Sequence, residues 1–357
     1  MASHRFIADE LSVIAPSLGI RYSGINASMI AVLPEQAKRI RIAALGFHIG
    51  DPIPQISVWQ FCRHCWRSRW RVWHARRNID MLVGLILRYV FRFRLLLVFT
   101  SAAQRRHSWI TRFCLRRMDG LIATSAAAAG YLNRDAAVVP HGVNIDVFSP
   151  PANRTATWND RGLPGKYGIG VFGRVRPQKG TEEVVDAMIQ VLPHRPDWTA
   201  VIIGETTPEF RTFQQRLRTK IGDAGLTERI HFTGFLTRFD EIPNWYRALS
   251  VVVCPSRTEG FGLSCLEAMA SGCPVIATHA GAWPELVCDG VDGHLVPCAD
   301  TNALAAAVLK ITEDPLRLCQ MGQRAREKVV RQYRICTEAD GIYAVYRGLL
   351  GKRGIDI

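Results

Sequence analysis

Nine consecutive residues in the second half of the chain combine two carboxylates with a glycine-containing turn. The segment runs from Glu259 to Glu267 and reads EGFGLSCLE. An apolar, β-branched run that ends at Cys254 precedes it and predicts a buried strand. Apolar residues at helical spacing begin at Leu263, so the turn should join the carboxyl end of a strand to the start of a helix. In an open parallel sheet, ligands bind at such positions.

The chemistry of this turn suits an anion flanked by hydroxyl groups. Backbone N–H groups at the helix start and the positive end of the helix dipole favour a phosphate near Leu263. Gly262 lacks the Cβ that would keep an anion away from the backbone. Glu259 and Glu267 can both accept hydrogen bonds from sugar hydroxyls. The pattern therefore favours a sugar nucleotide, although a helix-capping glutamate beside an ordinary surface glutamate is the alternative.

A second strand-to-helix turn carries positive charge. The apolar run that ends at Gly173 is followed by the basic loop RVRPQKG, and a periodic helix is predicted from Thr181. Arg174 can bridge two phosphate oxygens with its guanidinium fork, and Lys179 supplies a point charge. Together they can stabilise the charge that develops on a leaving diphosphate. A solvated basic turn is the alternative, and the accompanying carboxylate motif argues against it.

Spaced as they are here, the two turns resemble those of the retaining glycosyltransferases of family 4. The resemblance covers about residues 138 to 348 and includes the junction segment VPHGVN at 139–144 and the segment GAWPE at 281–285. It implies the GT-B fold, an α/β architecture of two Rossmann-like domains whose parallel sheets face each other across a cleft. It also implies that Arg174 and Lys179 bind the diphosphate and that Glu259 binds the donor sugar.

The resemblance implies a larger set of donor contacts. Glu267 is similar to the ribose ligand, and the loop at Gly234 is similar to the one beside the nucleobase. The expected donor-binding residues are Gly173, Arg174, Lys179, Gly234, Phe235, Glu259, Phe261, Gly262, Leu263 and Glu267, with Arg174, Lys179 and Glu259 catalytic. We expect no metal and no other cofactor, because the chain lacks an Asp-x-Asp motif and the two cations would neutralise the diphosphate.

Three segments of the N-terminal half resemble one subgroup of this family, the bacterial lipopolysaccharide core mannosyltransferases. The segments are RYSG at 21–24, VWHARRN at 72–78 and FTSAAQR at 99–105. Such enzymes use GDP-mannose and act on the inner core attached to lipid A through Kdo, so we expect mannose transfer with retention of configuration. Two alternatives remain within related chemistry: a hexosyltransferase of cell-surface polysaccharide or glycolipid synthesis that uses a UDP- or ADP-sugar, and a sugar-nucleotide isomerase or epimerase.

One position in the part of the chain expected to bind the acceptor departs from the pattern of the wider family. Ser101 and Ala102 stand where many members place a histidine after a strand. His74, His107 and His141 are candidates to replace it, and nothing in the sequence selects among them. Arginines nearby would suit the carboxylates and phosphates of an inner core. The expected acceptor-binding residues are Ser23, Gly24, His74, Arg76 and Arg77.

Positive charge is concentrated in the first half of the chain. Residues 1–150 hold 20 Lys and Arg against 8 Asp and Glu, whereas residues 151–357 hold 25 against 23, within a net charge of +14. Tryptophans interleave with the arginines between residues 59 and 109. Such asymmetry predicts a polyanionic partner. We expect this partner to be an anionic membrane, with the protein attached peripherally to the cytoplasmic face of the inner membrane, and we expect no nucleic acid. The rival class is an arginine-rich nucleic-acid-binding protein.

The remaining patterns set the domain organisation. Alternating strands and helices predict a first domain over 1–149, with a C-terminal helix over about 335–357 packing back on it, and a second over 150–334. The first would bind the acceptor and the second the nucleotide sugar. We expect neither a signal peptide nor a membrane span, because charged residues interrupt the apolar stretches. A G-x-G-x-x-G match at 168–173 lies inside an apolar run, which argues against a dinucleotide site.

Overall fold

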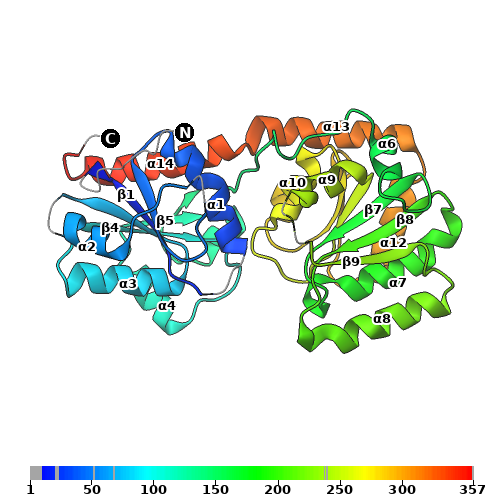
Figure 1. The fold of residues 1–357 in the computed structure, drawn as a ribbon, viewed down its shortest axis with the longest axis horizontal. Helices are drawn as coiled ribbons and strands as arrows, with labels where there is room; N and C mark the ends of the chain where they lie inside the picture. The colour runs from blue at the N-terminus through cyan, green and yellow to red at the C-terminus, as the bar shows by residue number, and fades with distance from the viewer. Residues whose placement is uncertain are drawn as a thin grey trace. The chain divides into compact units, whose positions relative to one another are not determined.

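The chain divides into two compact units in the computed structural model, which describes residues 10–20, 24–50, 53–66, 69–236, 238 and 240–355 (Figure 1). Unit 1 comprises residues 1–142 and 335–357, and unit 2 comprises residues 143–334. The first boundary therefore precedes the one expected after residue 149. Val143 already belongs to unit 2, because its N–H donates to the carbonyl oxygen of Tyr333 at 2.9 Å.

Unit 1 is built on a parallel six-stranded sheet with the order β2-β1-β3-β4-β5-β6. The strands are β1 (Val13–Ser17), β2 (Ile42–Gly46), β3 (Arg71–Ala75), β4 (Leu95–Ser101), β5 (Gly120–Ala123) and β6 (Ala137–Val138). The helices are α1 (Gly24–Ala37), α2 (Val58–Cys65), α3 (Asn78–Tyr89), α4 (Trp109–Leu115), α5 (Ala126–Gly130) and α14 (Ile335–Gly351). Strands alternate with helices because parallel neighbours require crossover connections.

Side-chain alternation along these strands divides the core of unit 1 into two layers. One layer packs residues of α2 to α5 against one face of the sheet, and the other packs residues of α1 and α14 against the opposite face. On β3, for example, Trp73 lies in the first layer and Val72 in the second. The sheet is therefore covered on both faces, as parallel sheets normally are.

Helix α14 is tied to the end of the first segment of unit 1 by a buried carboxylate. Glu338 accepts a hydrogen bond from the backbone N–H of Gly142 at 2.8 Å and pairs with His141 Nδ1 at 2.8 Å. Tyr346, one of the helix's buried residues, hydrogen-bonds His74 on β3. These contacts hold the last helix within unit 1.

Unit 2 contains a second parallel six-stranded sheet, with the order β12-β11-β10-β7-β8-β9. Its strands are β7 (Tyr167–Phe172), β8 (Trp198–Ile203), β9 (Ile230–Gly234), β10 (Val251–Cys254), β11 (Val275–Thr278) and β12 (Gly293–Val296). Its α-helices are α6 (Arg154–Asn159), α7 (Thr181–Val191), α8 (Arg211–Asp223), α9 (Glu241–Ala248), α10 (Leu263–Ala270), α11 (Trp283–Leu286), α12 (Thr301–Ile311) and α13 (Pro315–Gln332). The expectation of two parallel α/β domains is confirmed.

Two glycines inside β7 allow the strand to pack closely with its surroundings. A Cβ on Gly168 would lie 2.3 Å from the Trp158 ring, and one on Gly170 would lie 2.1 Å from Leu249 Cδ1. Both belong to the G-x-G-x-x-G match, so these glycines serve packing within a strand. In the described ranges, no helix is long and apolar enough to cross a bilayer.

Gly180, in the turn between β7 and α7, provides a test of the fold of unit 2. Its φ is +69°, and a Cβ there would lie 2.0 Å from the carbonyl oxygen of Pro255. We predict that Gly180→Ala lowers the free energy of unfolding by roughly 2–4 kcal/mol, measured by urea titration, because backbone strain and overpacking combine.

The matched control is Gly222→Ala in α8, where a Cβ would meet no atom within 4 Å. This substitution should raise the free energy of unfolding by about 0.5–1 kcal/mol, since alanine is the better helix former. Equal stability of Gly180→Ala and the wild type would show that the turn adapts to a side chain.

Candidate active site

The two motif-bearing turns meet where the strand order of unit 2 reverses. β7 pairs with β10, with Val171 opposite Val253. From this central pair the chain continues outward to β8 on one side and to β11 on the other. Such a reversal is where open α/β sheets bind ligands, outside the carboxyl ends of the strands.

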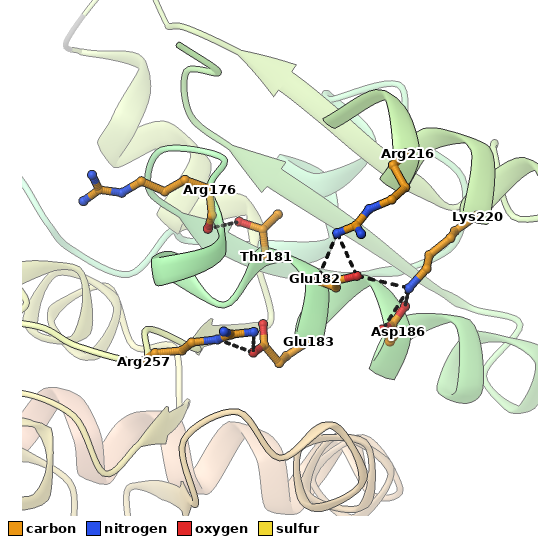
Figure 2. A network of polar contacts seen from close by, with 8 residues as sticks. All are labelled: Arg176, Thr181, Glu182, Glu183, Asp186, Arg216, Lys220 and Arg257. Atoms are coloured by element: carbon orange, nitrogen blue, oxygen red, sulfur yellow. Dashed lines mark hydrogen bonds and ion pairs between the residues drawn. The ribbon is translucent and has the colours of Figure 1, made fainter. Parts of the chain in front are cut away.

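Several contacts join the turn after β7 to the turn after β10. Lys179 forms an ion pair with Glu259, and both side chains are partly buried. The backbone N–H of Arg257 donates to the carbonyl oxygen of Gln178 at 3.0 Å. Its Nε donates to Oε1 of Glu183 at 2.6 Å, as Figure 2 shows. The two turns therefore form one connected structure.

The acidic residues at the start of α7 face cations of α8. Arg216 contacts both carboxylate oxygens of Glu182 at 3.1 and 3.0 Å, and Lys220 lies 3.0 Å from Asp186 Oδ1 (Figure 2). The hydrogen bond with Asp186 raises the pKa of Lys220. Glu182 and Asp186 are thus paired on the α8 side, whereas Glu183 pairs with Arg257 of the motif loop.

The start of α10 has the geometry of an anion site. Gly262 precedes the helix with φ +86°, and as a glycine at the N-cap it has no side chain to cap the first turn. Trp283 Nε1 donates to the carbonyl oxygen of Gly262 at 3.1 Å. A Cβ on Gly262 would lie 2.2 Å from that same indole nitrogen, so the position requires glycine. The helix begins at Leu263 with its positive end directed to the motif loop.

Glu267, one helical turn further along, is held by Tyr246 of α9. The Tyr246 hydroxyl donates to Glu267 Oε2 at 2.9 Å, and its ring stacks on Phe172 with centroids 3.8 Å apart. Burial raises the pKa of the Glu267 carboxyl from 4.5 to about 7. The hydrogen bond from Tyr246 acts in the opposite direction and stabilises the carboxylate. Glu267 is thus a positioned carboxylate that changes charge near neutral pH.

Two arginines bind the carbonyl groups at the far end of α10. Arg154 Nη2 donates to the carbonyl oxygen of Ser271 at 2.7 Å, and Arg326 Nη1 donates to that of Ala270 at 2.6 Å. Arg154 Nη1 also donates to the carbonyl oxygen of Tyr246 at 3.1 Å. Cations are favourable at helix C-termini. They fix the helix whose opposite end forms the anion site.

The structure places the expected donor-binding residues in unit 2, at three strand ends. Gly173 follows β7, and Arg174 beside it is exposed and makes no hydrogen bond or ion pair with any residue that the structure describes. The motif loop follows β10. Gly234 and Phe235 lie at the end of β9, which β8 separates from β7, and the Phe235 side chain is 64% exposed.

The expected acceptor residues lie in unit 1. Ser23 falls outside the described residues, and Gly24 begins α1. His74 is fully buried, with Nδ1 2.5 Å from the Tyr346 hydroxyl and Nε2 2.6 Å from Thr100 Oγ1. Its ring is enclosed and both nitrogens are engaged, so direct contact of His74 with an acceptor would require these hydrogen bonds to open and stays a prediction.

Arg76 and Arg77 differ in their surroundings at the end of β3. Arg77 donates to Asn26 Oδ1 on α1. The Arg76 side chain is buried, yet neither terminal guanidinium nitrogen has a hydrogen-bond partner in the described part of the chain. Leaving a buried cation without partners is costly. Arg76 therefore has the capacity to bind an anion.

Sequence reasoning missed the residues that support the motifs. Tyr246, Arg257 and Arg154 hold the glutamates and α10, yet none stands in a motif. Only Trp283 could have been singled out from the sequence, because it lies in the segment GAWPE at 281–285, which is part of the family resemblance. The others act across the sheet from distant parts of the chain, which no local pattern reveals.

Comparison with known proteins identifies the class. The family model of the glycosyl transferases group 1 matches residues 166–314. The chain belongs to this family of glycosyltransferases. It is 42% identical over 347 residues to the lipopolysaccharide core biosynthesis mannosyltransferase LpcC of Rhizobium leguminosarum bv. viciae, covering 96% of this chain and 97% of that protein.

Solved structures agree with the fold and with unit 2. The C-terminal domain of the glycosyl transferase group 1 protein LpcC from Francisella tularensis is 47% identical, with a TM-score of 0.53, over 54% of this chain and 99% of that one. Anabaena HepE, solved in complex with UDP, matches 94% of this chain and 99% of its own with a TM-score of 0.80 at 22% identity, which supports the fold alone.

The raised pKa of Glu267 predicts a pH dependence of binding. If the ionised carboxylate accepts hydroxyl hydrogen bonds, affinity for an intact sugar nucleotide should fall about tenfold between pH 8 and pH 6, because protonation removes the charge. Isothermal titration calorimetry measures this, and Glu267→Gln should abolish the dependence. A pH-independent wild-type affinity would contradict the role.

The same substitution should change stability in a pH-dependent way. The folded chain retains the Glu267 proton up to about pH 7, whereas the unfolded chain loses it near 4.5. Wild-type stability therefore decreases as pH rises from 4.5 to 7, and Glu267→Gln avoids this loss. Relative to the wild type, the free energy of unfolding of Glu267→Gln should be roughly 1–3 kcal/mol more favourable at pH 8 than at pH 4.5. Chemical denaturation at the two pH values measures this difference.

The Lys179–Glu259 ion pair predicts competition between a carboxylate and a diphosphate for one ammonium group. Glu259→Gln should tighten the binding of a free nucleoside diphosphate about threefold to tenfold, measured by calorimetry, because Lys179 loses its internal partner. Lys179→Ala should weaken binding, and Glu259→Gln should bring no gain in that background. Asp197→Asn, at the exposed Lys166–Asp197 pair of unit 2, is the matched control without effect.

Proposed function

We propose that this chain transfers mannose from GDP-mannose, with retention of configuration, to the inner core of lipopolysaccharide. The observation that carries the proposal is the assembly of two cations, the uncapped start of α10 and two positioned glutamates at the strand-order reversal of unit 2. The choice of mannose and of a lipopolysaccharide core is supported by the 42% identity to LpcC of Rhizobium leguminosarum across nearly the full length of both proteins.

In this proposal unit 2 binds the donor. Arg174, Lys179 and the N-terminus of α10 hold the diphosphate, and Glu259 accepts hydrogen bonds from the sugar. Glu267 accepts from the ribose, and Gly234 with Phe235 borders the base. As the bond from the sugar to the diphosphate breaks, negative charge grows on the leaving phosphate. Fixed cations and oriented N–H groups stabilise that charge without reorganising.

The acceptor hydroxyl attacks the anomeric carbon from the face that the diphosphate leaves. Its oxygen forms the new glycosidic bond, and its proton passes to an oxygen of the departing phosphate. The products are a mannosylated acceptor with the original anomeric configuration and GDP. The role of the protein is to bind both substrates and stabilise the leaving group, so no carboxylate pair is required on the two sides of the bond.

Unit 1 binds the acceptor in this proposal, through Ser23, Gly24, Arg76 and Arg77. Support comes from the unsatisfied guanidinium of Arg76, since an inner core presents carboxylate and phosphate groups that such a cation binds well. We place the enzyme on the cytoplasmic face of the inner membrane, attached peripherally. The concentration of positive charge in the first half of the chain supports contact with an anionic membrane.

The test is a transfer assay with purified protein, nucleotide sugars and a Kdo-bearing lipid A precursor. We expect GDP-mannose to release GDP only when the lipid is present, and mass spectrometry to show the addition of one hexose. Lys179→Ala should reduce the turnover at least about a hundredfold, because one leaving-group cation is removed.

Asp197→Asn serves as the unaffected control. Transfer from a UDP- or ADP-sugar would keep the class and overturn the mannose assignment. Conversion of the nucleotide sugar without a lipid would indicate an isomerase or epimerase instead.

A further inference from the structure

Exposed apolar side chains are unevenly distributed over the chain. Of the 21 large apolar side chains that are exposed in the described part, 12 lie between residues 58 and 113, and only 4 lie in unit 2. They lie in α2, at Trp66 directly after α2, in α3 and the turn after it, and in α4. We name the outward side of these three helices the outer face of unit 1.

The three helices belong to one layer of unit 1. Phe61 of α2, Met81 of α3 and Cys114 of α4 are buried in the same core cluster against one face of the sheet. Figure 1 shows α2, α3 and α4 on the opposite side of this sheet from α14. Their solvent-facing sides therefore look outward on the same side of the unit.

Apolar residues follow helical spacing on this outward side. On α3, Ile79, Leu82 and Ile86 are exposed and alternate with the buried Met81 and Leu85. A stripe at spacing i, i+3, i+7 that faces water has no stabilising role within the unit. An exposed apolar patch of this kind indicates an interaction surface.

Aromatic side chains extend the patch onto the neighbouring helices. Trp59 of α2 is 65% exposed and Trp109 of α4 is 72% exposed, and Phe113 lies one turn after Trp109. Arginines stack on two of these rings: Arg63 lies 5.1 Å from the centroid of Trp59, and Arg117 lies 3.6 Å from that of Phe113. The face thus presents aromatic rings with guanidinium groups beside them.

The charge of the outer face has a single sign. The exposed arginines of these helices and of the segments that flank α4 are Arg63, Arg92, Arg94, Arg105, Arg106, Arg112, Arg116 and Arg117. Between residues 53 and 134 the only acids in the described chain are Asp80 and Asp119. Asp80 is buried and accepts backbone N–H groups, and Asp119 pairs with Arg88 at 2.5 Å. No exposed carboxylate offsets the arginines there.

We infer that the outer face of unit 1 docks on an anionic lipid bilayer, with Trp59, Trp109, Phe113 and the α3 stripe in the interface and the arginines at the phosphates. Aromatic rings favour the headgroup level, and arginine stems extend over apolar groups while their charges remain at the polar surface. Stable attachment without a membrane span needs both apolar insertion and basic charge, and this face supplies both.

Other occupants fit these features less well. Nucleic acid would neutralise the arginines but would leave the aliphatic stripe of α3 in water. A second copy in a symmetric contact would bring two positive faces together without carboxylates to pair them. A bilayer with anionic headgroups satisfies the apolar groups and the charges at once.

This inference deepens the proposed function by naming the surface that brings the enzyme to a lipid-linked acceptor. Its test does not use donor or acceptor, so its failure and that of the sugar assignment can be told apart. The assay is co-sedimentation of the full chain with vesicles of phosphatidylcholine containing phosphatidylglycerol, compared with phosphatidylcholine alone.

Two combined variants address the two contributions separately. One carries Trp59→Ser, Trp109→Ser and Phe113→Ser, and the other carries Arg112→Gln, Arg116→Gln and Arg117→Gln. All six positions are exposed, and far-UV circular dichroism together with a cooperative urea-unfolding transition checks that each variant is folded. The matched control is in α13 of unit 2, with Leu316→Ser, Arg317→Gln and Arg324→Gln, which are also exposed.

We expect the wild type and the control to bind the anionic vesicles, and each outer-face variant to bind at least about tenfold more weakly. Equal binding of the outer-face variants and the wild type would overturn the inference, as would absence of wild-type binding. Tighter binding to duplex DNA than to vesicles, lost in the arginine variant, would assign the face to nucleic acid. A dimer in sedimentation that either variant converts to a monomer would assign it to self-association.

Discussion

The hydrogen-bonded pairing of β7 with β10 determines how the two motif-bearing turns of unit 2 lie relative to each other. The two strands are neighbours, but the chain leaves them toward opposite edges of the sheet, so their carboxyl ends are both open to a ligand. The tight fit of Gly170 against Leu249 and of Gly180 against the Pro255 carbonyl sets how closely the two turns approach. Lys179 meets Glu259 only because this pairing exists.

Local patterns predict most of this architecture because strands buried on both faces read as continuous apolar runs. The strand before Gly173, the strand that ends at Cys254 and the helix from Thr181 were expected and are present. β6 was missed, since Ala137 and Val138 are exposed and too few to form a pattern. The burial of His74 could not be predicted either, because a polar residue in a fully buried strand has the same sequence pattern as one at a surface.

The motifs themselves could be recognised, but their supports could not. Tyr246 lies 21 residues from Glu267, and Arg154 lies 117 residues from Ser271. Only the tertiary fold brings these pairs together. The raised pKa of Glu267 likewise depends on how deeply the fold buries it beside Tyr246, which residue types alone do not determine. Burial of the Glu267 carboxyl, and of the Arg76 guanidinium without hydrogen-bond partners for its terminal nitrogens in the described chain, costs folding free energy. Such costs are typical of residues that serve binding rather than stability.

The two arginines at the far end of α10 change the electrostatic potential that this helix produces around it. An α-helix alone is a dipole, and the potentials of its two ends partly cancel at a distance, more so in a helix of eight residues, about 12 Å long. Arg154 and Arg326 neutralise the carbonyl end from partly buried positions that salt screens weakly. The positive end at Leu263 then acts nearly as an isolated charge, so its attraction for an approaching anion declines slowly with distance.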